Sequence, residues 1–211
     1  MSTIVGVFAH PDDEAFGPGG TLAKLAKDND VYIICCTDGN HQEKGLKNIR
    51  GKELLASAKV LGIKQVLFLD FEDGKLCNAN YHQLADVLKT KLDALKPETV
   101  ITFHPNGVSG HIDHIVVTSV VNFLFTQLKY LKKIMYFCMR DVERKMIPSY
   151  FVHMPEGVAR KDADYIEDVS TFWTIKNAAM RKHKSQIKDL VMITTMQALL
   201  SKEEYFIIKS K

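Results

Sequence analysis

Short apolar runs that alternate with longer amphipathic stretches limit the fold of this chain more than any other feature. The runs are rich in β-branched and aliphatic residues and predict strands over 3–9, 31–37, 65–69, 99–103 and 134–139. The stretches between them space apolar side chains three and four positions apart and predict helices over 20–27, 46–61, 81–95 and 111–128. Strands that alternate with helices form a parallel sheet between two helical layers, so the sequence predicts an α/β fold.

The rest of the chain has a weaker pattern. It predicts a polar loop over 38–46, a strand over 150–153, a helix over 172–188 and a short terminal helix over 202–208. No repeat, low-complexity tract or linker interrupts the sequence. The 211 residues therefore predict one domain, 1–211.

Composition argues against several classes of protein. A formal net charge of +3, with both signs interspersed, is too small to indicate a nucleic-acid partner. The most apolar long stretch, 112–128, has polar side chains throughout and predicts a buried helix, since a membrane span needs about 20 mostly apolar residues. The N-terminus shows no signal peptide, and four scattered cysteines are too few for a disulfide scaffold. We therefore expect a cytoplasmic protein with reduced cysteines and no membrane anchor.

Chemically dense segments follow two of the predicted strands. FAHPDDE (8–14) ends the first strand with a histidine and three carboxylates, His10, Asp12, Asp13 and Glu14. HPNGVSGHIDH (104–114) follows the fourth strand with three histidines and an aspartate, His104, His111, Asp113 and His114. Ligands of such sheets bind at the carboxyl ends of the strands, so the fold can bring the two segments together. Imidazole and carboxylate are ligands of zinc and similar divalent ions.

Spacing assigns only some of these side chains. His111 and His114 are three apart at the start of a predicted helix and share a face, whereas Asp113 is better placed to hold a ring N–H than to bind a metal. A catalytic zinc site takes three protein ligands. One carboxylate and one histidine of the two segments then remain free to act as general base and general acid. Spacing does not decide whether Asp12 or Asp13 binds the metal, nor whether His111 or His114 does.

Each of these sequence motifs also has a purely structural interpretation. Taken alone, the acidic run 12–14 caps a helix, His111 and His114 are surface residues, and 104–107 is a turn. The placement of both clusters after strands of one predicted sheet argues against these interpretations. The glycines at 17–20 lack the last glycine of a dinucleotide-binding loop, and no GK[ST] phosphate-binding motif occurs.

The motifs together resemble the zinc-dependent de-N-acetylases of the PIG-L/LmbE-like family. AHPDDE (9–14) and GHIDH (110–114) carry the resemblance. Further matches extend it in the same order over most of the chain, at RGKELLASAKVLGI (50–63), FLDFEDG (68–74) and KNAAMRKHKSQ (176–186). The resemblance implies a three-layer, Rossmann-like, mostly parallel sheet of the LmbE type. It also implies an enzyme that removes the acetyl group from a small N-acetylglucosamine-type sugar or glycoconjugate.

The resemblance also implies roles for the residues of the two loops. It implies that His10, Asp13 and His114 bind one zinc ion and that Asp12 is the general base. It implies that His111 stabilises the oxyanion and protonates the leaving amine, while Asp113 orients and charge-stabilises His111.

Other positions match the family outside these loops. The resemblance places Arg50 and Ser109 at the substrate, with Ser109 where mycothiol-type relatives have a tyrosine. His183 and Gln186 match recurring positions, for which no role follows; the bland interpretation is that they dock the last helix.

The sequence leaves alternatives open. Histidine and carboxylate also bind Fe, Mn and Co. The same site could serve a two-metal phosphoesterase, another amidohydrolase, or a metal-dependent isomerase or lyase. A carbohydrate-binding protein with a structural metal is a further alternative, and neither the aglycone nor a homo-oligomeric state follows from the sequence.

Overall fold

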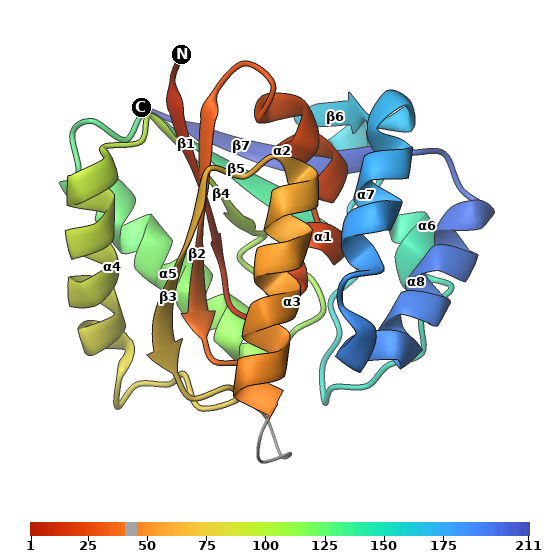
Figure 1. The fold of residues 1–211 in the computed structure, drawn as a ribbon, viewed down its shortest axis with the longest axis horizontal. Coiled ribbons are helices and arrows are strands. Elements are labelled where there is room, and N and C mark those ends of the chain that lie inside the picture. The colour runs from red at the N-terminus through yellow and green to blue at the C-terminus, as the bar shows by residue number, and fades with distance from the viewer. Residues whose placement is uncertain (41–45) are drawn as a thin grey trace.

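The computed structural model describes residues 1–40 and 46–211, and its described strands form one seven-stranded sheet (Figure 1). Residues 41–45 of the predicted polar loop lie outside the described residues. The strands are β1 (Thr3–Phe8), β2 (Asp30–Thr37), β3 (Gln65–Phe71), β4 (Thr99–Phe103), β5 (Lys133–Cys138), β6 (Tyr165–Asp168) and β7 (Glu203–Ser210). Their order is β3-β2-β1-β4-β5-β7-β6, and β1 to β5 are parallel. The predicted, mostly parallel α/β sheet is confirmed.

Helices cover both faces of this sheet. They are α1 (Asp13–Phe16), α2 (Gly19–Leu25), α3 (Leu46–Leu61), α4 (Tyr81–Leu95), α5 (Ile112–Gln127), α6 (Asp141–Arg144), α7 (Trp173–Met180) and α8 (Ile187–Ala198). Helices α4 and α5 pack side by side on one face, while α2, α3 and α7 pack together on the other (Figure 1). Among the described residues, no helix has the length and apolar character needed to cross a membrane.

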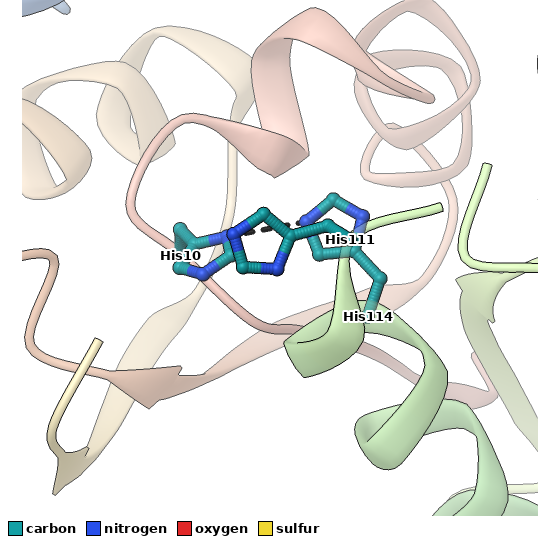
Figure 2. Close-up of side chains that lie close together, drawn as sticks. All are labelled: His10, His111 and His114. Atoms are coloured by element: carbon teal, nitrogen blue, oxygen red, sulfur yellow. Dashed lines mark hydrogen bonds between the residues drawn. The ribbon is translucent and has the colours of Figure 1, made fainter. Parts of the chain in front are cut away.

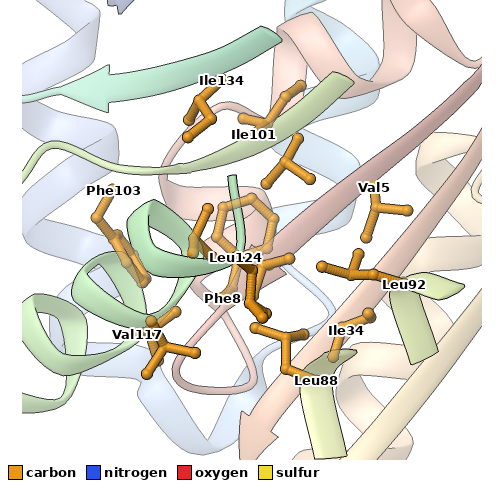
Figure 3. Close-up of a cluster of buried hydrophobic side chains, with 14 of the residues drawn as sticks. Val5, Phe8, Ile34, Leu88, Leu92, Ile101, Phe103, Val117, Leu124 and Ile134 are labelled. Carbon is orange, nitrogen blue, oxygen red and sulfur yellow. The ribbon is translucent and has the colours of Figure 1, made fainter. Parts of the chain in front are cut away.

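The main core lies between the sheet and the layer of α4 and α5 (Figure 3). Helix α4 buries Leu84, Leu88 and Leu92, which are four residues apart and therefore form one stripe along the helix. From the sheet, Val5 and Ile34 meet this stripe, and both are fully buried. The periodicity seen in the sequence thus indicates the packing correctly.

Strand order explains how two distant loops meet. From β1 the chain builds outward to β2 and β3 on one side, and then crosses back to place β4 on the other side of β1. The carboxyl ends of β1 and β4 flank the point where the order reverses, which is where ligands bind in sheets of this kind. Residues 9–14 follow β1 and residues 104–114 follow β4, so both chemically dense segments lie at this point.

The C-terminal end of the chain differs from its prediction. The expected terminal helix over 202–208 is instead strand β7, which runs antiparallel to both β5 and β6. The segment Tyr205–Ile208 is aromatic and β-branched, and β5 offers it an edge to pair with. Strand β6 was not predicted at all.

Two further predictions in this part of the chain are corrected. Residues 150–153 form no strand, since their backbone bends and the side chain of Val152 is fully exposed. The helix predicted over 172–188 ends at Met180 with α7 and is followed by a 3₁₀ turn, Lys184–Gln186. The chain turns there because His183, between the two, points into the protein and is completely buried.

A buried ion pair ties β7 to the opposite end of the sequence. Nζ of Lys176 lies 2.6 Å from Oε1 of Glu204, and the side chains are 2% and 3% exposed. Glu204 also accepts the backbone N–H groups of Gly20 and Thr21 at the start of α2, and Lys176 donates to the carbonyl oxygen of Gly17. The pair therefore joins α7, β7 and the N-terminus of α2.

We expect Lys176→Met to lower the free energy of unfolding by about 3–5 kcal/mol, because it leaves the Glu204 carboxylate buried without its cation. The matched control is Lys24→Met, which breaks the ion pair with Glu167. Lys24 is 47% exposed, so that loss should be at most about 1 kcal/mol. Urea unfolding measures both values, and equal losses would show that the buried pair does not stabilise the fold.

Candidate active site

The loop after β1 directs three adjacent carboxylates to three different partners. Asp12 has the backbone angles φ 131° and ψ −27°, which are unusual for a residue other than glycine and cost about 1–3 kcal/mol. Glu14 supports this conformation because its Oε2 accepts the backbone N–H of Asp12 at 3.1 Å. Its Oε1 accepts a hydrogen bond from Ser57 at 2.5 Å and lies 2.7 Å from Nε2 of His183. Glu14 is 1% exposed, so this acidic run is not a solvated helix cap.

The loop after β4 presents its histidines through the start of α5. His111 is the N-cap residue of this helix, and its Nδ1 accepts the backbone N–H of Asp113 at 3.1 Å. His114 follows in the first turn, where its Nδ1 lies 3.0 Å from the carbonyl oxygen of Gly107. Gly110 has φ +84°, and a Cβ there would lie 2.1 Å from the carbonyl oxygen of His153. Only glycine fits at this position.

The three predicted metal ligands converge at the switch point of the sheet (Figure 2 shows the histidines). Nδ1 of His10 lies 3.1 Å from Nε2 of His114. The carboxylate of Asp13 places one oxygen 3.5 Å from the His10 nitrogen and the other 3.4 Å from the His114 nitrogen. Two imidazoles and a carboxylate match the donor set of a catalytic zinc site, whose Zn–N bonds of about 2.0–2.1 Å bring donors this close together.

His111 lies beside the triangle that is formed by the side chains of His10, Asp13 and His114. Its ring centroid is 4.6 Å from that of His10 and 5.1 Å from that of His114. The three histidines also offer ring nitrogens that lie within 4.8 Å of one another. The set with Asp13 is tighter and includes a negative charge, so we favour it as the metal site and leave His111 at its edge.

The electrostatics of the triangle favour a positive charge between its atoms. Burial lowers the pKa of His10, but hydrogen bonds with Asp113, Asp13 and Asp73 outweigh it and hold this pKa well above its usual value. Burial lowers the pKa of His114 to about 4, so its Nε2 offers a lone pair at neutral pH. A bound cation would meet this demand for positive charge. The residues therefore fit a metal ion.

Asp113 orients a different histidine from the one expected. Its Oδ2 lies 3.2 Å from Nε2 of His10, and its two oxygens accept the backbone N–H groups of Gly74 and Leu76. The carboxylate thus holds the ring nitrogen of His10 that faces away from the triangle, as partners of metal-binding histidines do. The backbone N–H of Asp113 donates to His111. Burial lowers the pKa of His111, whereas the charge of the Asp113 carboxylate raises it. The carboxylate therefore orients His10 rather than His111, and its expected charge stabilisation of His111 stays a prediction.

We expect Asp113→Asn to lower zinc affinity by about 10- to 100-fold, because His10 loses the carboxylate that orients its ring. Titration against a zinc chelator measures this affinity. Asp93→Asn is a matched control, because the Asp93 side chain is 42% exposed and pairs with Lys89. A variant that keeps its zinc affinity but loses turnover would instead support the original assignment of Asp113 to His111.

Arg50 is held by four partners around the loop after β1. Its Nη2 donates to Oδ2 of Asp12 and to the carbonyl oxygen of Pro11, both at 2.9 Å. Its Nη1 donates to the carbonyl oxygen of Gly39 at 2.9 Å and to Asp73 at 3.4 Å. The side chain is 9% exposed. The guanidinium therefore anchors the Asp12 carboxylate and the loop around it, and the expected contact of Arg50 with substrate stays a prediction.

The pKa of Asp12 suits a group that exchanges a proton near neutral pH. Burial raises this pKa to about 7, the positive charge of Arg50 lowers it, and the negative charge of Asp13 raises it. A general base works best when its pKa lies near the operating pH. Asp12 therefore combines a suitable pKa with a place beside the triangle.

A cavity of about 430 Å³ opens over this cluster. Asp12, Asp13, His111 and His114 line one end of it. Ser109 also lines the cavity, consistent with its predicted place near a substrate. The cavity continues past His111 toward β5 and α8.

His104 and His183 have local roles. Nδ1 of His104 lies 3.4 Å from the backbone N–H of Asn106 within a turn, and this side chain does not line the cavity. His183 contacts Glu14, as described above, whereas Gln186 donates to the neighbouring Ser185. The interpretation of residues 104–107 as a turn is thus confirmed.

Sequence reasoning missed the part that Asp73 takes in the site. Its Oδ1 lies 3.2 Å from Nε2 of His10, and its Oδ2 lies 3.4 Å from Nη1 of Arg50. Asp73 belongs to the segment 68–74 that follows β3, at the same edge of the sheet as the other two loops. That position was the signal that could have identified it.

Comparison with known proteins identifies the family of this chain. Residues 5–124 match the family model described as PIG-L, GlcNAc-PI de-N-acetylase. The N-acetylglucosaminyl-phosphatidylinositol de-N-acetylase of Bos taurus is 37% identical over 124 residues, which cover 56% of this chain and 48% of the relative. A probable enzyme of the same name from Schizosaccharomyces pombe is 29% identical over 201 residues, 89% of this chain and 79% of the relative.

A solved structure has the same fold. The N,N'-diacetylchitobiose deacetylase from Pyrococcus horikoshii superposes with a TM-score of 0.75 at 22% sequence identity. The superposition covers 99% of this chain and 84% of that one. The fold implied by the sequence motifs, a mostly parallel sheet of the LmbE type, is therefore confirmed.

Proposed function

Because the chain belongs to the PIG-L family of de-N-acetylases, we propose that it hydrolyses the amide bond of N-acetylglucosamine-type sugars with the help of one bound zinc ion. Acetate and a free amine are the products. The expected partner is a small N-acetyl sugar or glycoconjugate. The assignment of individual residues below is part of this proposal.

The convergence of His10, Asp13 and His114 is the observation that carries it. Their donor atoms lie 3.1–3.5 Å apart, and their surroundings stabilise a positive charge. These three residues would hold the ion. A divalent ion there supplies a Lewis acid that polarises a carbonyl group and makes water a better nucleophile at neutral pH.

Asp12 is the group that removes the proton of the attacking water. Its carboxylate lies next to the metal ligand Asp13 in the sequence and is held by Arg50 at 2.9 Å. The strained backbone of Asp12 and its bond to Glu14 keep the carboxylate in place. Because its position is set before substrate binds, little reorganisation is needed at the moment of reaction.

His111 is the group that donates a proton to the leaving nitrogen. Its Nδ1 accepts the backbone N–H of Asp113, so in the neutral ring the proton lies on Nε2. In the neutral ring this Nε2–H can donate a hydrogen bond to a developing oxyanion. To protonate the leaving nitrogen the ring must first take up a second proton, and the imidazolium then returns to the neutral form as the amine leaves. The N-cap geometry of α5 fixes the orientation of this ring.

We also propose that the protein works in a reducing compartment such as the cytoplasm. All four cysteines are free, and Cys35, Cys36 and Cys138 are buried. Burial raises the pKa of the Cys138 thiol to about 12, so it stays protonated at neutral pH. Buried, protonated thiols of this kind are inert and need no oxidising environment.

The experiment that tests the function combines metal analysis with an activity screen. Purified full-length protein should bind one zinc per chain and release acetate from N-acetylglucosamine glycosides. Chelation should abolish the release, and added zinc should restore it. A stoichiometry of two metals together with phosphoester hydrolysis, or zinc-loaded protein that releases no acetate from any N-acetyl sugar, would overturn the proposal.

A further inference from the structure

We propose that His183 is a positioning residue for the reaction. It holds the Glu14 carboxylate, and Glu14 in turn fixes the backbone that aims Asp12 at the attacking water. The inference rests on the proposed function and gives a role to a buried histidine that the mechanism above does not use. A chain of contacts between remote segments, together with the unusual backbone of Asp12, carries it.

His183 is buried completely just after helix α7. Its Nε2 lies 2.7 Å from Oε1 of Glu14, which stands 169 positions earlier in the sequence. Its Nδ1 has no hydrogen-bond partner among the residues that the structure describes. An apolar side chain would fill this space without burying an unpaired nitrogen, which is unfavourable. Packing alone therefore does not explain a histidine here, whereas the bond to Glu14 does.

The carboxylate of Glu14 depends on such donors because it is almost fully buried. Burial lowers the pKa of His183, but the charge of Glu14 and the hydrogen bond with it raise this pKa above its usual value. A hydrogen bond to an ionised carboxylate is charge-assisted and stronger than one between neutral groups. Ser57 donates to the same oxygen at 2.5 Å. Two donors therefore hold Oε1, which leaves Oε2 directed at the loop after β1.

The other oxygen of Glu14 acts on the general base. Its Oε2 accepts the backbone N–H of Asp12 at 3.1 Å, and that backbone has φ 131°. A residue other than glycine keeps such a conformation only where its surroundings hold it. Arg50 holds Oδ2 of Asp12, whereas Glu14 holds the peptide nitrogen, so the direction of the side chain depends on both. If Glu14 rotated away, the peptide could relax and the Asp12 carboxylate would move.

The neighbouring metal ligand has a support of its own. Oδ2 of Asp13 accepts the backbone N–H of His10 at 2.7 Å, a contact that involves neither Glu14 nor His183. Loss of the His183 side chain should therefore displace Asp12 and leave the zinc site in place. This separates a positioning role from general support of the fold.

Two substitutions of His183 test the role in the full-length, zinc-loaded protein. His183→Leu fills a similar space but cannot donate, and it should lower kcat on an N-acetylglucosaminide about 10- to 100-fold, with KM and zinc content little changed. His183→Gln can still donate to Glu14 from its amide and should keep kcat within about threefold of the wild type. The matched control is Tyr136→Phe, which removes another hydrogen bond of a buried side chain, to Asn122, outside the cavity. It should leave kcat unchanged.

A double-mutant cycle shows whether His183 acts through Asp12. In an Asp12→Asn background the base is already lost, so His183→Leu should lower kcat no further, whereas independent effects would add. Hydrogen exchange of the Asp12 amide, followed by NMR, gives a readout besides activity. This exchange should be about tenfold faster in His183→Leu than in the wild type or in His183→Gln.

A second variant covers the case in which His183→Leu does not fold. Ser57→Ala removes the other donor to Oε1 of Glu14 and should lower kcat about threefold or more, again with zinc retained. Wild-type kcat in this variant would contradict the role of Glu14 and of the donors that hold it.

Several further results would overturn the inference. They are wild-type kcat in folded His183→Leu, a loss that His183→Gln does not recover, and an equal further loss in the Asp12→Asn background. In each case acetate release by the wild type leaves the proposed function intact. A wild-type protein that releases no acetate from any N-acetyl sugar removes the function and the positioning role together.

Discussion

Replacement of Asp12 by asparagine is expected to lower kcat by about 10²- to 10⁴-fold while zinc stays bound. Asparagine has nearly the same shape and can still accept a hydrogen bond from Arg50, but it cannot take a proton from water. Steady-state kinetics on an N-acetylglucosaminide and metal analysis of the same sample measure the two quantities. Asp30→Asn is the matched control, because Asp30 pairs with Lys64 on the surface.

The same assignment predicts the pH dependence of the reaction. Asp12 acts only when it is deprotonated, and burial raises its pKa to about 7, so kcat should fall as the pH drops below about 7. Arg50 lowers this pKa, so Arg50→Met should move the acidic limb of the profile to higher pH. An Asp12→Asn enzyme with wild-type kcat, or an acidic limb that Arg50→Met does not move, would rule out Asp12 as the base.

Removal of a metal ligand is expected to have the largest effect. His114→Ala should reduce zinc from one per chain to a small fraction and lower kcat/KM by about 10³-fold or more, because the site loses both a donor and its Lewis acid. Inductively coupled plasma mass spectrometry of dialysed protein gives the zinc content, and circular dichroism checks that the fold is kept.

His104→Ala is the matched control for this variant. His104 lies in the same loop after β4, but its ring contacts only a turn and does not line the cavity. Its loss should leave zinc content and activity unchanged. A His114→Ala protein that retains stoichiometric zinc at wild-type affinity would mean that His114 is not a ligand.

The central part of the fold follows from the sequence because its strands are local patterns. Each of β1 to β5 is a short apolar run, and the helices between them have clear amphipathic spacing. Strand β7 has no such decisive local pattern, since a short apolar segment near the C-terminus suits a helix or a strand equally well. Its pairing with β5, which lies 65 or more residues earlier in the chain, decides between them.

The candidate site was also predictable from the sequence only in part. The two loops could be singled out because they follow strands that the fold brings together, but only the family resemblance selected His10, Asp13 and His114 within them. The protein partners of Asp113 and Arg50 could not be predicted from the sequence. Each carries several donors or acceptors and lies within reach of more than one neighbour, so only the packed structure shows which contacts form.

By itself, the sequence determined a parallel sheet with two reactive loops at the carboxyl ends of its strands, because strand alternation and residue type are properties of the chain. The tertiary structure alone decided that Asp113 orients His10, that Arg50 holds Asp12, and that a cavity extends past His111 toward β5 and α8. The physical reason is that hydrogen bonds, pKa shifts and cavities depend on distances between segments that are remote in sequence. Those distances exist only after the chain has folded.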